Sequence, residues 1–251
     1  MKRQIGVAML VALTALTSLA SGALAQCTTG MLIKWDENGF AYETLYNPNT
    51  FISSATSQLV VVGKVSAFCQ MLIGLDATDP TKEYTYIFSG LTSAGTVGPT
   101  AIAGGSTRWT TNYGNGQFFI YEDNSPDAPN PVAMPASPPN ATVPANYTDG
   151  TVILSGNIVN FSTTITRFST GSYATSFRGD FAFTGGTLFN LVGPEFGLLT
   201  GLWCANDDAA PGVLGLCDLP TGYSSHPNGK FDQPSTPAQT STWGAIKQLY
   251  R

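Results

Sequence analysis

Short runs of β-branched and aromatic residues, separated by turn-forming residues, constrain the fold of this chain most strongly. In residues 173–184, Phe177 and Phe181 alternate with Arg178 and Asp180, so apolar side chains recur with a period of two. This pattern is typical of an antiparallel strand with one buried face and one wet face. Other expected strands are residues 31–35, 40–46, 58–69, 84–90, 107–113, 116–122 and 151–168.

The segments between these runs contain the residues that turns require. Asn38-Gly39 and Asn115-Gly116 each lie between two expected strands, and Asn-Gly supplies the positive φ angles of tight hairpin turns. Residues 123–147 break the pattern with seven prolines, which cannot donate to a strand ladder. We therefore expect a hairpin at Asn38-Gly39, a turn at Asn115-Gly116 and one long Pro-rich surface loop.

The whole pattern predicts an all-β protein, either an antiparallel β-sandwich or a jelly roll. A single domain is expected at residues 26–240, with the Pro-rich loop at 123–147 and a short C-terminal tail at 241–251. Residues 188–203 combine helical spacing with several glycines and are expected to mix strand and loop. Residues 223–240 are rich in Pro, Ser, Asn and Thr and are expected to form a loop.

The first 25 residues have the pattern of a secretory signal peptide. Lys2 and Arg3 precede an apolar run at residues 5–19, and Ala23-Leu24-Ala25 matches a cleavage site before Gln26. The apolar run is shorter than the ~20 residues that span a bilayer as a helix, so cleavage is expected rather than anchoring. Lipidation of Cys27 is the alternative, although Gln26 is bulky for the residue before a lipidated cysteine.

Charge and composition limit the partners of the mature chain. Without Lys2 and Arg3 it has 9 basic and 16 acidic residues, a net charge of −7. Nucleic acids and anionic membranes attract basic surfaces, so neither is expected as a partner. No transmembrane segment is expected in the mature chain either.

Four cysteines remain after the expected cleavage: Cys27, Cys69, Cys204 and Cys217. An even number of cysteines in an exported chain predicts two disulfides. Of the three possible pairings we favour Cys27–Cys69 and Cys204–Cys217, because the second closes a short loop rich in Gly, Asp and Pro. A zinc site is the alternative, but the chain lacks a Cys-x2-Cys pair and has a single histidine.

Two acidic segments are candidate calcium sites, because calcium takes several oxygen ligands from flexible loops. Glu122, Asp123 and Asp127 lie where an expected strand meets the Pro-rich loop. Residues 206–208 and Asp218 form a second group inside the proposed disulfide loop. Calcium is the only cofactor that the sequence suggests.

Support for sugar stacking or for hydrolysis is weaker. The tryptophans at positions 35, 109, 203 and 243 can stack on glycans only where they are exposed, and most tryptophans in sheets belong to the core. A hydrolase with a serine or cysteine nucleophile needs a general base. His226, the only histidine, lies in an expected loop, and the chain has no Gly-x-Ser-x-Gly motif. No residue is therefore predicted to be catalytic.

Residues 118–186 resemble bacterial exported proteins of the type associated with PEP-CTERM sorting tails. The matching segments are residues 117–123, 148–156 and 179–186. The resemblance implies an extracellular or cell-envelope β-sandwich, and the family offers no catalytic residues. The sorting tail itself, with Pro-Glu-Pro, an apolar span and a basic end, is not found in this chain.

Together these features predict a secreted or cell-envelope protein without enzymatic activity, of structural, matrix or adhesion type. Its partners would be glycans or other surface proteins. The first alternative is a carbohydrate- or calcium-dependent binding module, and the second is an extracellular hydrolase. A flat polar surface would favour the first function, exposed aromatic residues the binding module, and facing carboxylates in a deep pocket the hydrolase.

Overall fold

The structure, a computed structural model, describes residues 30–35, 39–68, 72, 74–128, 145–194, 196–204 and 224–233. The predicted signal peptide, most of the Pro-rich loop and the C-terminal tail lie outside these residues. The bounds of the strands and helices are β1 Met31–Trp35, β2 Gly39–Glu43, β3 Tyr46–Asn47, β4 Ile52–Ser53, β5 Gln58–Lys64, β6 Ala67–Phe68, β7 Glu83–Ile102, η2 Ala103–Gly105, β8 Ser106–Tyr113, β9 Gly116–Asp123, η4 Ala145–Tyr147, β10 Thr151–Arg167, β11 Tyr173–Gly185, α3 Phe189–Val192, β12 Phe196–Cys204 and β13 His226–Asp232.

In the described part of the chain, eleven strands form one antiparallel sheet, and β3 and β4 form a small second sheet. Several short strands run in line: β8 and β9 both pair with β7 on one side and β10 on the other. Likewise β1 pairs with β6 while β2 pairs with β5. The sheet is therefore a meander in which each strand, or in-line pair of strands, lies beside the next in the chain.

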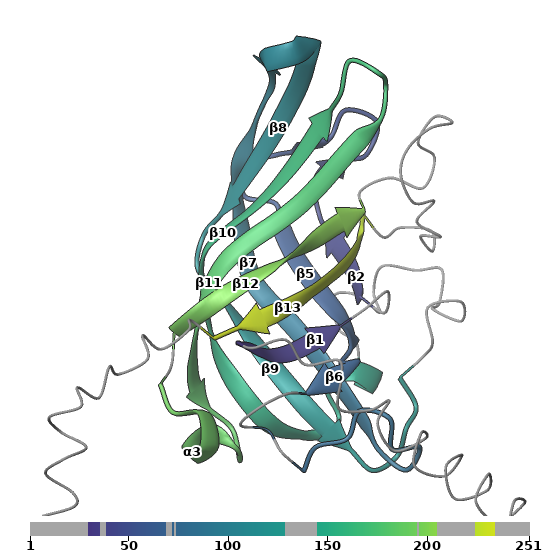
Figure 1. The fold of residues 1–251 in the computed structure, drawn as a ribbon, viewed down its shortest axis with the longest axis vertical. Helices are drawn as coiled ribbons and strands as arrows, with labels where there is room; N and C mark the ends of the chain where they lie inside the picture. The colour runs from purple at the N-terminus through teal and green to yellow at the C-terminus, as the bar shows by residue number, and fades with distance from the viewer. Residues whose placement is uncertain are drawn as a thin grey trace, which may run out of the picture.

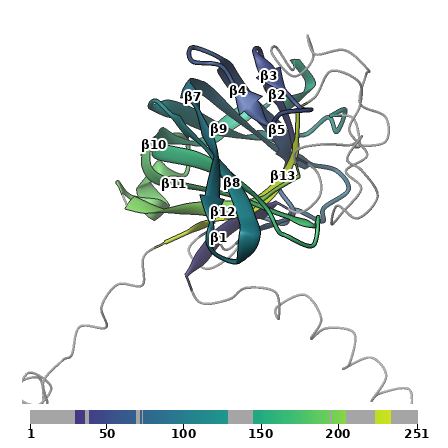
Figure 2. The same ribbon diagram turned by 90° about the horizontal axis from the view of Figure 1, so that it is seen from above.

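The two ends of this meander meet. Strand β13 pairs with β1, and a bridge joins Ala41 of β2 to Ser225, just before β13. The Ala41 N–H donates to the Ser225 carbonyl at 2.9 Å. The sheet is thus rolled, as the view from above shows (Figure 2). The prediction of an all-β antiparallel fold is confirmed. The two layers expected of a sandwich correspond to opposite walls of this one rolled sheet.

Aromatic rings fill the inside of the roll. Trp35 is fully buried, and its ring lies 4.9 Å from Tyr86, 5.5 Å from Phe88 and 5.4 Å from Phe231, measured between centroids. Glycines on the inner wall make room for these rings: a Cβ on Gly229 would lie 2.6 Å from the Phe177 ring and 2.9 Å from Trp35. The rings and the glycines opposite them therefore form one interlocked core.

The alternation predicted for residues 173–184 is confirmed by strand β11. Phe177, Phe181 and Phe183 are buried, whereas Arg178 is exposed. The predicted hairpin at Asn38-Gly39 and the predicted turn at Asn115-Gly116 are wrong. Strands β1 and β2 do not pair with each other, and β8 and β9 run in the same direction along β7. Gly114 continues this path, since its N–H donates to the Thr92 carbonyl of β7 at 2.7 Å.

Residues 223–240, predicted to be a loop, include β13. This strand lies between β12 and β1 and places Phe231 in the core. Pro227, Asn228 and Gly229 have low strand propensity, so the strand depends on its two neighbours rather than on its own residues.

Four strands extend beyond the roll and form an arm (Figure 1). We define the arm as residues 93–113 and 161–178, which include this extension and its base in the roll, where Phe177 and Arg178 still pair with Gly201 and Thr200 of β12. The hairpin of β3 and β4 packs on the inner face of the arm, where the Phe51 ring lies 5.4 Å from both Trp109 and Tyr173. The Ser53 N–H also donates to Thr96 Oγ1 at 2.8 Å. The opposite, outer face of the arm belongs to the surface.

Candidate functional site

Three carboxylates converge at the end of the roll opposite the arm. Glu83 is the first residue of β7, Asp123 is the last residue of β9, and these two residues are paired across the strands. Asp127 follows four residues later. One carboxylate oxygen from each lies within 4.8 Å of the others. We call these residues the acidic group.

Glu83 organises this group from a buried position. Its Oε1 accepts the backbone N–H of Asp127 at 3.0 Å and that of Ala128 at 2.9 Å, which folds the chain back after β9. Lys64 Nζ lies 3.1 Å from the other oxygen, Oε2. Asp123 Oδ1 accepts the N–H of Ser125 at 2.9 Å, and this bond tightens the same turn.

Of the three residues predicted to bind calcium, the structure brings Asp123 and Asp127 together but not Glu122. Strand alternation sends the side chain of Glu122 to the other face, where Oε1 lies 2.6 Å from Lys82 Nζ. Glu83 occupies the third position in the group. Glu83 could have been identified from the sequence only by predicting that the start of β7 pairs with the end of β9.

The acidic group carries excess negative charge. Desolvation raises the pKa of nearby Asp149, and the negative charges of Asp127, Asp123 and Glu83 add to this rise, although a backbone hydrogen bond acts in the opposite direction. Among the described residues, Lys64 forms an ion pair with the group, through Glu83. Oxygen-rich surroundings with this charge are suited to a hard cation such as calcium.

A second polar cluster, around Glu43 of β2, was not predicted. The Glu43 carboxylate is buried and accepts hydrogen bonds from the hydroxyl groups of Ser53 and Tyr113, the latter at 3.2 Å. Ser93 Oγ lies 2.8 Å from Ser53 Oγ and can donate to it, because the single hydrogen of the Ser53 hydroxyl is used on Glu43. An acidic residue at an inward-facing position of an expected strand was the sequence signal.

Burial dominates the electrostatics of this cluster. It raises the pKa of Glu43, although hydrogen bonds from Ser53, Ser57 and Tyr113 act in the opposite direction. Burial and the Glu43 charge together raise the pKa of Tyr46 and of Tyr113. The cluster lies beneath the β3–β4 hairpin and links it to the arm, which indicates a structural role.

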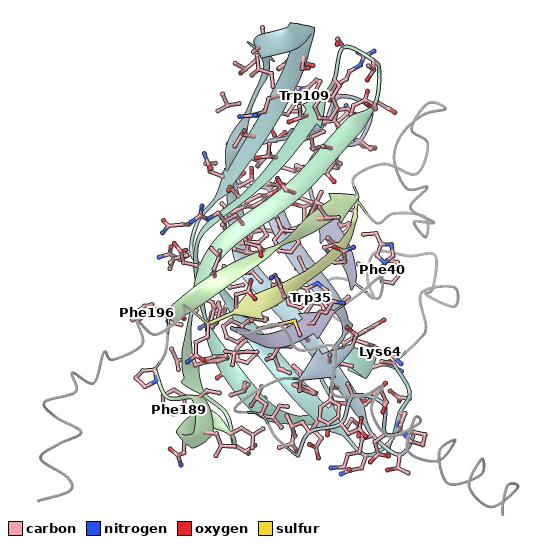
Figure 3. All side chains as sticks on the ribbon, viewed as in Figure 1. Trp35, Phe40, Lys64, Trp109, Phe189 and Phe196 are labelled. Atoms are coloured by element: carbon pink, nitrogen blue, oxygen red, sulfur yellow. The ribbon has the colours of Figure 1, made fainter. Side chains whose placement is uncertain are left out.

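The tryptophans and the histidine have packing roles. Trp35 and Trp203 are in the core, whereas Trp109 lies on the arm against Phe51 (Figure 3). His226 begins β13 instead of lying in a loop, and its ring stacks on Phe40 with centroids 4.9 Å apart and planes 4° apart.

Several predicted site residues lie outside the described part of the chain. Cys204 ends β12, but its side chain and the residues Cys27, Cys69 and Cys217 are not described. The two disulfides therefore stay a prediction, as does the second calcium group at residues 206–208 and 218. Trp243 is outside the described residues as well.

Comparison of the chain with protein-family models, with curated proteins and with solved structures gives no match. A search of the described residues finds no helix with the length and apolar character that crossing a membrane requires.

Proposed function

We propose that this chain is an exported protein without enzymatic activity, of structural, matrix or adhesion type, which acts through its outer surface. The observation that carries the proposal is the outer face of the arm. Val97, Thr110, Thr164 and Ser176 are register neighbours there on four adjacent strands, and they are partly or fully exposed. Three of these four side chains carry hydroxyl groups, and an exposed sheet face of this kind suits contact with an extended partner better than enclosure of a small substrate.

Two further features support this proposal. The roll that carries the arm is filled with aromatic rings around Trp35, so it has the build of a rigid support. The N-terminal pattern of residues 1–25 favours export, and the resemblance to exported bacterial β-proteins favours the same location.

The hydrolase alternative has less support. The only histidine of the chain, His226, stacks on Phe40, so its imidazole ring has a packing role in the sheet. The buried Glu43 hydrogen-bonds to Ser53, but both side chains are covered and neither faces solvent.

Fractionation of the source cells tests the proposal. We expect the chain in the medium or the envelope fraction. Its intact mass should be that of a chain beginning at Gln26, because Ala23-Leu24-Ala25 directs cleavage. A diacylglyceryl group on Cys27 would identify a lipoprotein instead. A cytoplasmic chain that retains Met1, or turnover of glycoside, ester or peptide substrates by the purified protein, would overturn the proposal.

A calcium-dependent binding module is a second candidate, and the acidic group favours it. Three carboxylate oxygens within 4.8 Å of one another would repel, and a bound cation would offset this repulsion. In this candidate function, calcium would brace the turn after β9 and so hold the start of the Pro-rich loop against the roll.

Thermal melts in calcium and in chelator test this site. Extracellular calcium sites bind with a Kd of about 0.1–1 mM, so about 10 mM calcium should add about 1.4–2.7 kcal/mol and raise the Tm by about 3–10 °C. Asp123→Asn and Asp127→Asn should abolish the shift. Glu122→Gln is the matched control and should keep it, because Glu122 pairs with Lys82. No shift in the wild type, or an equal shift in Asp123→Asn, eliminates the site.

A further inference from the structure

The charge of the arm differs from that of the rest of the protein. The full chain has 16 acidic and 11 basic residues, but the arm contains no Asp or Glu. It contains Arg108, Arg167 and Arg178, which are all the arginines among the described residues, and each of them is exposed. The described part of the roll carries lysines instead. The arm is thus a cationic projection on an anionic protein.

Strand register places two of these arginines on the outer face. Arg108 pairs with Thr166, Arg178 pairs with Ser162, and Thr166 and Ser162 are four residues apart on β10. With about 3.3 Å per residue and about 4.8 Å between strands, the two arginines lie about 16 Å apart on a diagonal. The side chain of Arg167 points to the same side of β10 as that of the buried Ile165, two residues earlier. Arg167 therefore belongs to the other face of the arm.

Polar groups occupy the diagonal between Arg108 and Arg178. Thr110, Thr164 and Ser176 form one row across the strands, and Asn112 and Ser162 belong to the next. Hydroxyl and amide groups both donate and accept hydrogen bonds. Just beyond the arm, Asp180 is two residues from Arg178 in the same alternation of β11, and it accepts a hydrogen bond from Asn160 Nδ2 at 2.8 Å.

We propose that the outer face of the arm binds an acidic polysaccharide, with Arg108 and Arg178 contacting carboxylate or sulfate groups and the hydroxyl rows contacting sugar hydroxyls. Guanidinium groups bind such anions through paired hydrogen bonds. A polymer of sugars that carries both acidic groups and free hydroxyls matches this arrangement. Single-stranded DNA has no free hydroxyl along its sugar–phosphate chain, so it would leave the hydroxyl rows of the arm without sugar-hydroxyl partners.

This inference rests on the proposed function, because it takes the arm as the binding part of an exported protein. Its test uses the purified mature chain and four immobilised probes: polygalacturonate, chondroitin sulfate, neutral dextran and single-stranded DNA. We expect binding to polygalacturonate or chondroitin sulfate, with the tighter probe identifying the preferred anion. About 0.5 M salt should weaken this binding, because exposed charges are screened. Dextran and DNA should bind much more weakly.

Paired variants locate the site on the outer face. The double variant Arg108→Gln/Arg178→Gln should raise the Kd about tenfold or more, because charge-assisted hydrogen bonds are lost. Arg167→Gln removes the same charge from the other face of the arm and should leave the Kd within about threefold. All three positions are exposed, and unchanged melting temperatures would show that the variants fold.

Four outcomes would overturn the inference: no binding to either acidic polysaccharide, equal binding to dextran, equal binding to DNA, or equal weakening by Arg167→Gln. None of them bears on export or on the absence of catalysis, which the fractionation experiment tests separately.

Discussion

Replacing Trp35 with alanine is expected to lower the free energy of unfolding by about 3–5 kcal/mol. Trp35 is fully buried on β1 and contacts rings from several other strands of the roll, among them Tyr86, Phe88 and Phe177. Its removal would leave a cavity at the point where opposite walls meet. Because glycines such as Gly229 already bring the wall close to the ring, the backbone has little room to collapse into that cavity.

Urea unfolding followed by circular dichroism measures this loss, and Trp109→Ala provides the matched control. Trp109 is only partly buried on the arm, where its ring packs against Phe51, so its loss should cost clearly less. Equal losses at the two positions would mean that the interior of the roll is not the main source of stability.

Period-two alternation in the sequence was sufficient to predict strand identity, but not strand connection. In β11 the alternation identified both the strand and its buried face, because Phe177, Phe181 and Phe183 share one side. Asn115-Gly116 failed as a turn signal because the flanking strands both pair with β7, and this long-range pairing overrides local turn preference.

In strand β13 the error was the reverse: a segment predicted to be a loop is a strand. Pro227, Asn228 and Gly229 read as loop residues, yet the missing side chain at Gly229 is what allows the Phe177 and Trp35 rings to approach. The glycine is explained only by what lies across the roll. Such information is absent from any local window of the sequence.

The candidate site was predictable only in part for the same reason. Asp123 and Asp127 are neighbours in the chain, so a local pattern was sufficient to group them. Glu83 is 40 residues earlier in the chain than Asp123 and joins the group only through the pairing of β7 with β9. Glu43 was missed because a lone acidic residue within a strand usually faces solvent.

Glu43 should make the stability of the protein depend on pH. Burial raises the pKa of its carboxyl group in the folded state above the ordinary value of 4.5. The folded state therefore holds the proton more tightly than the unfolded state does. The stability that this proton contributes is fully present below the ordinary pKa and is lost as the pH rises through the raised value.

Comparison of wild type with Glu43→Gln isolates this effect, because glutamine does not titrate and other groups titrate in both proteins. From pH 4 upward, the unfolding free energy of the wild type should fall relative to the variant, by at most about 1.4 kcal/mol per pH unit. Tyr46 and Tyr113 face the same carboxylate, but burial raises the pKa of both phenols, so they stay neutral over this range.

Ser53→Ala supplies an independent check on the direction of this effect. The Ser53 hydroxyl donates to the Glu43 carboxylate and lowers its pKa, so its removal should extend the decline in stability to higher pH. Urea unfolding at half-unit pH steps measures all three proteins. Parallel curves for wild type and Glu43→Gln would show that folding leaves the proton affinity of Glu43 unchanged, and the buried cluster would then have no part in the pH response.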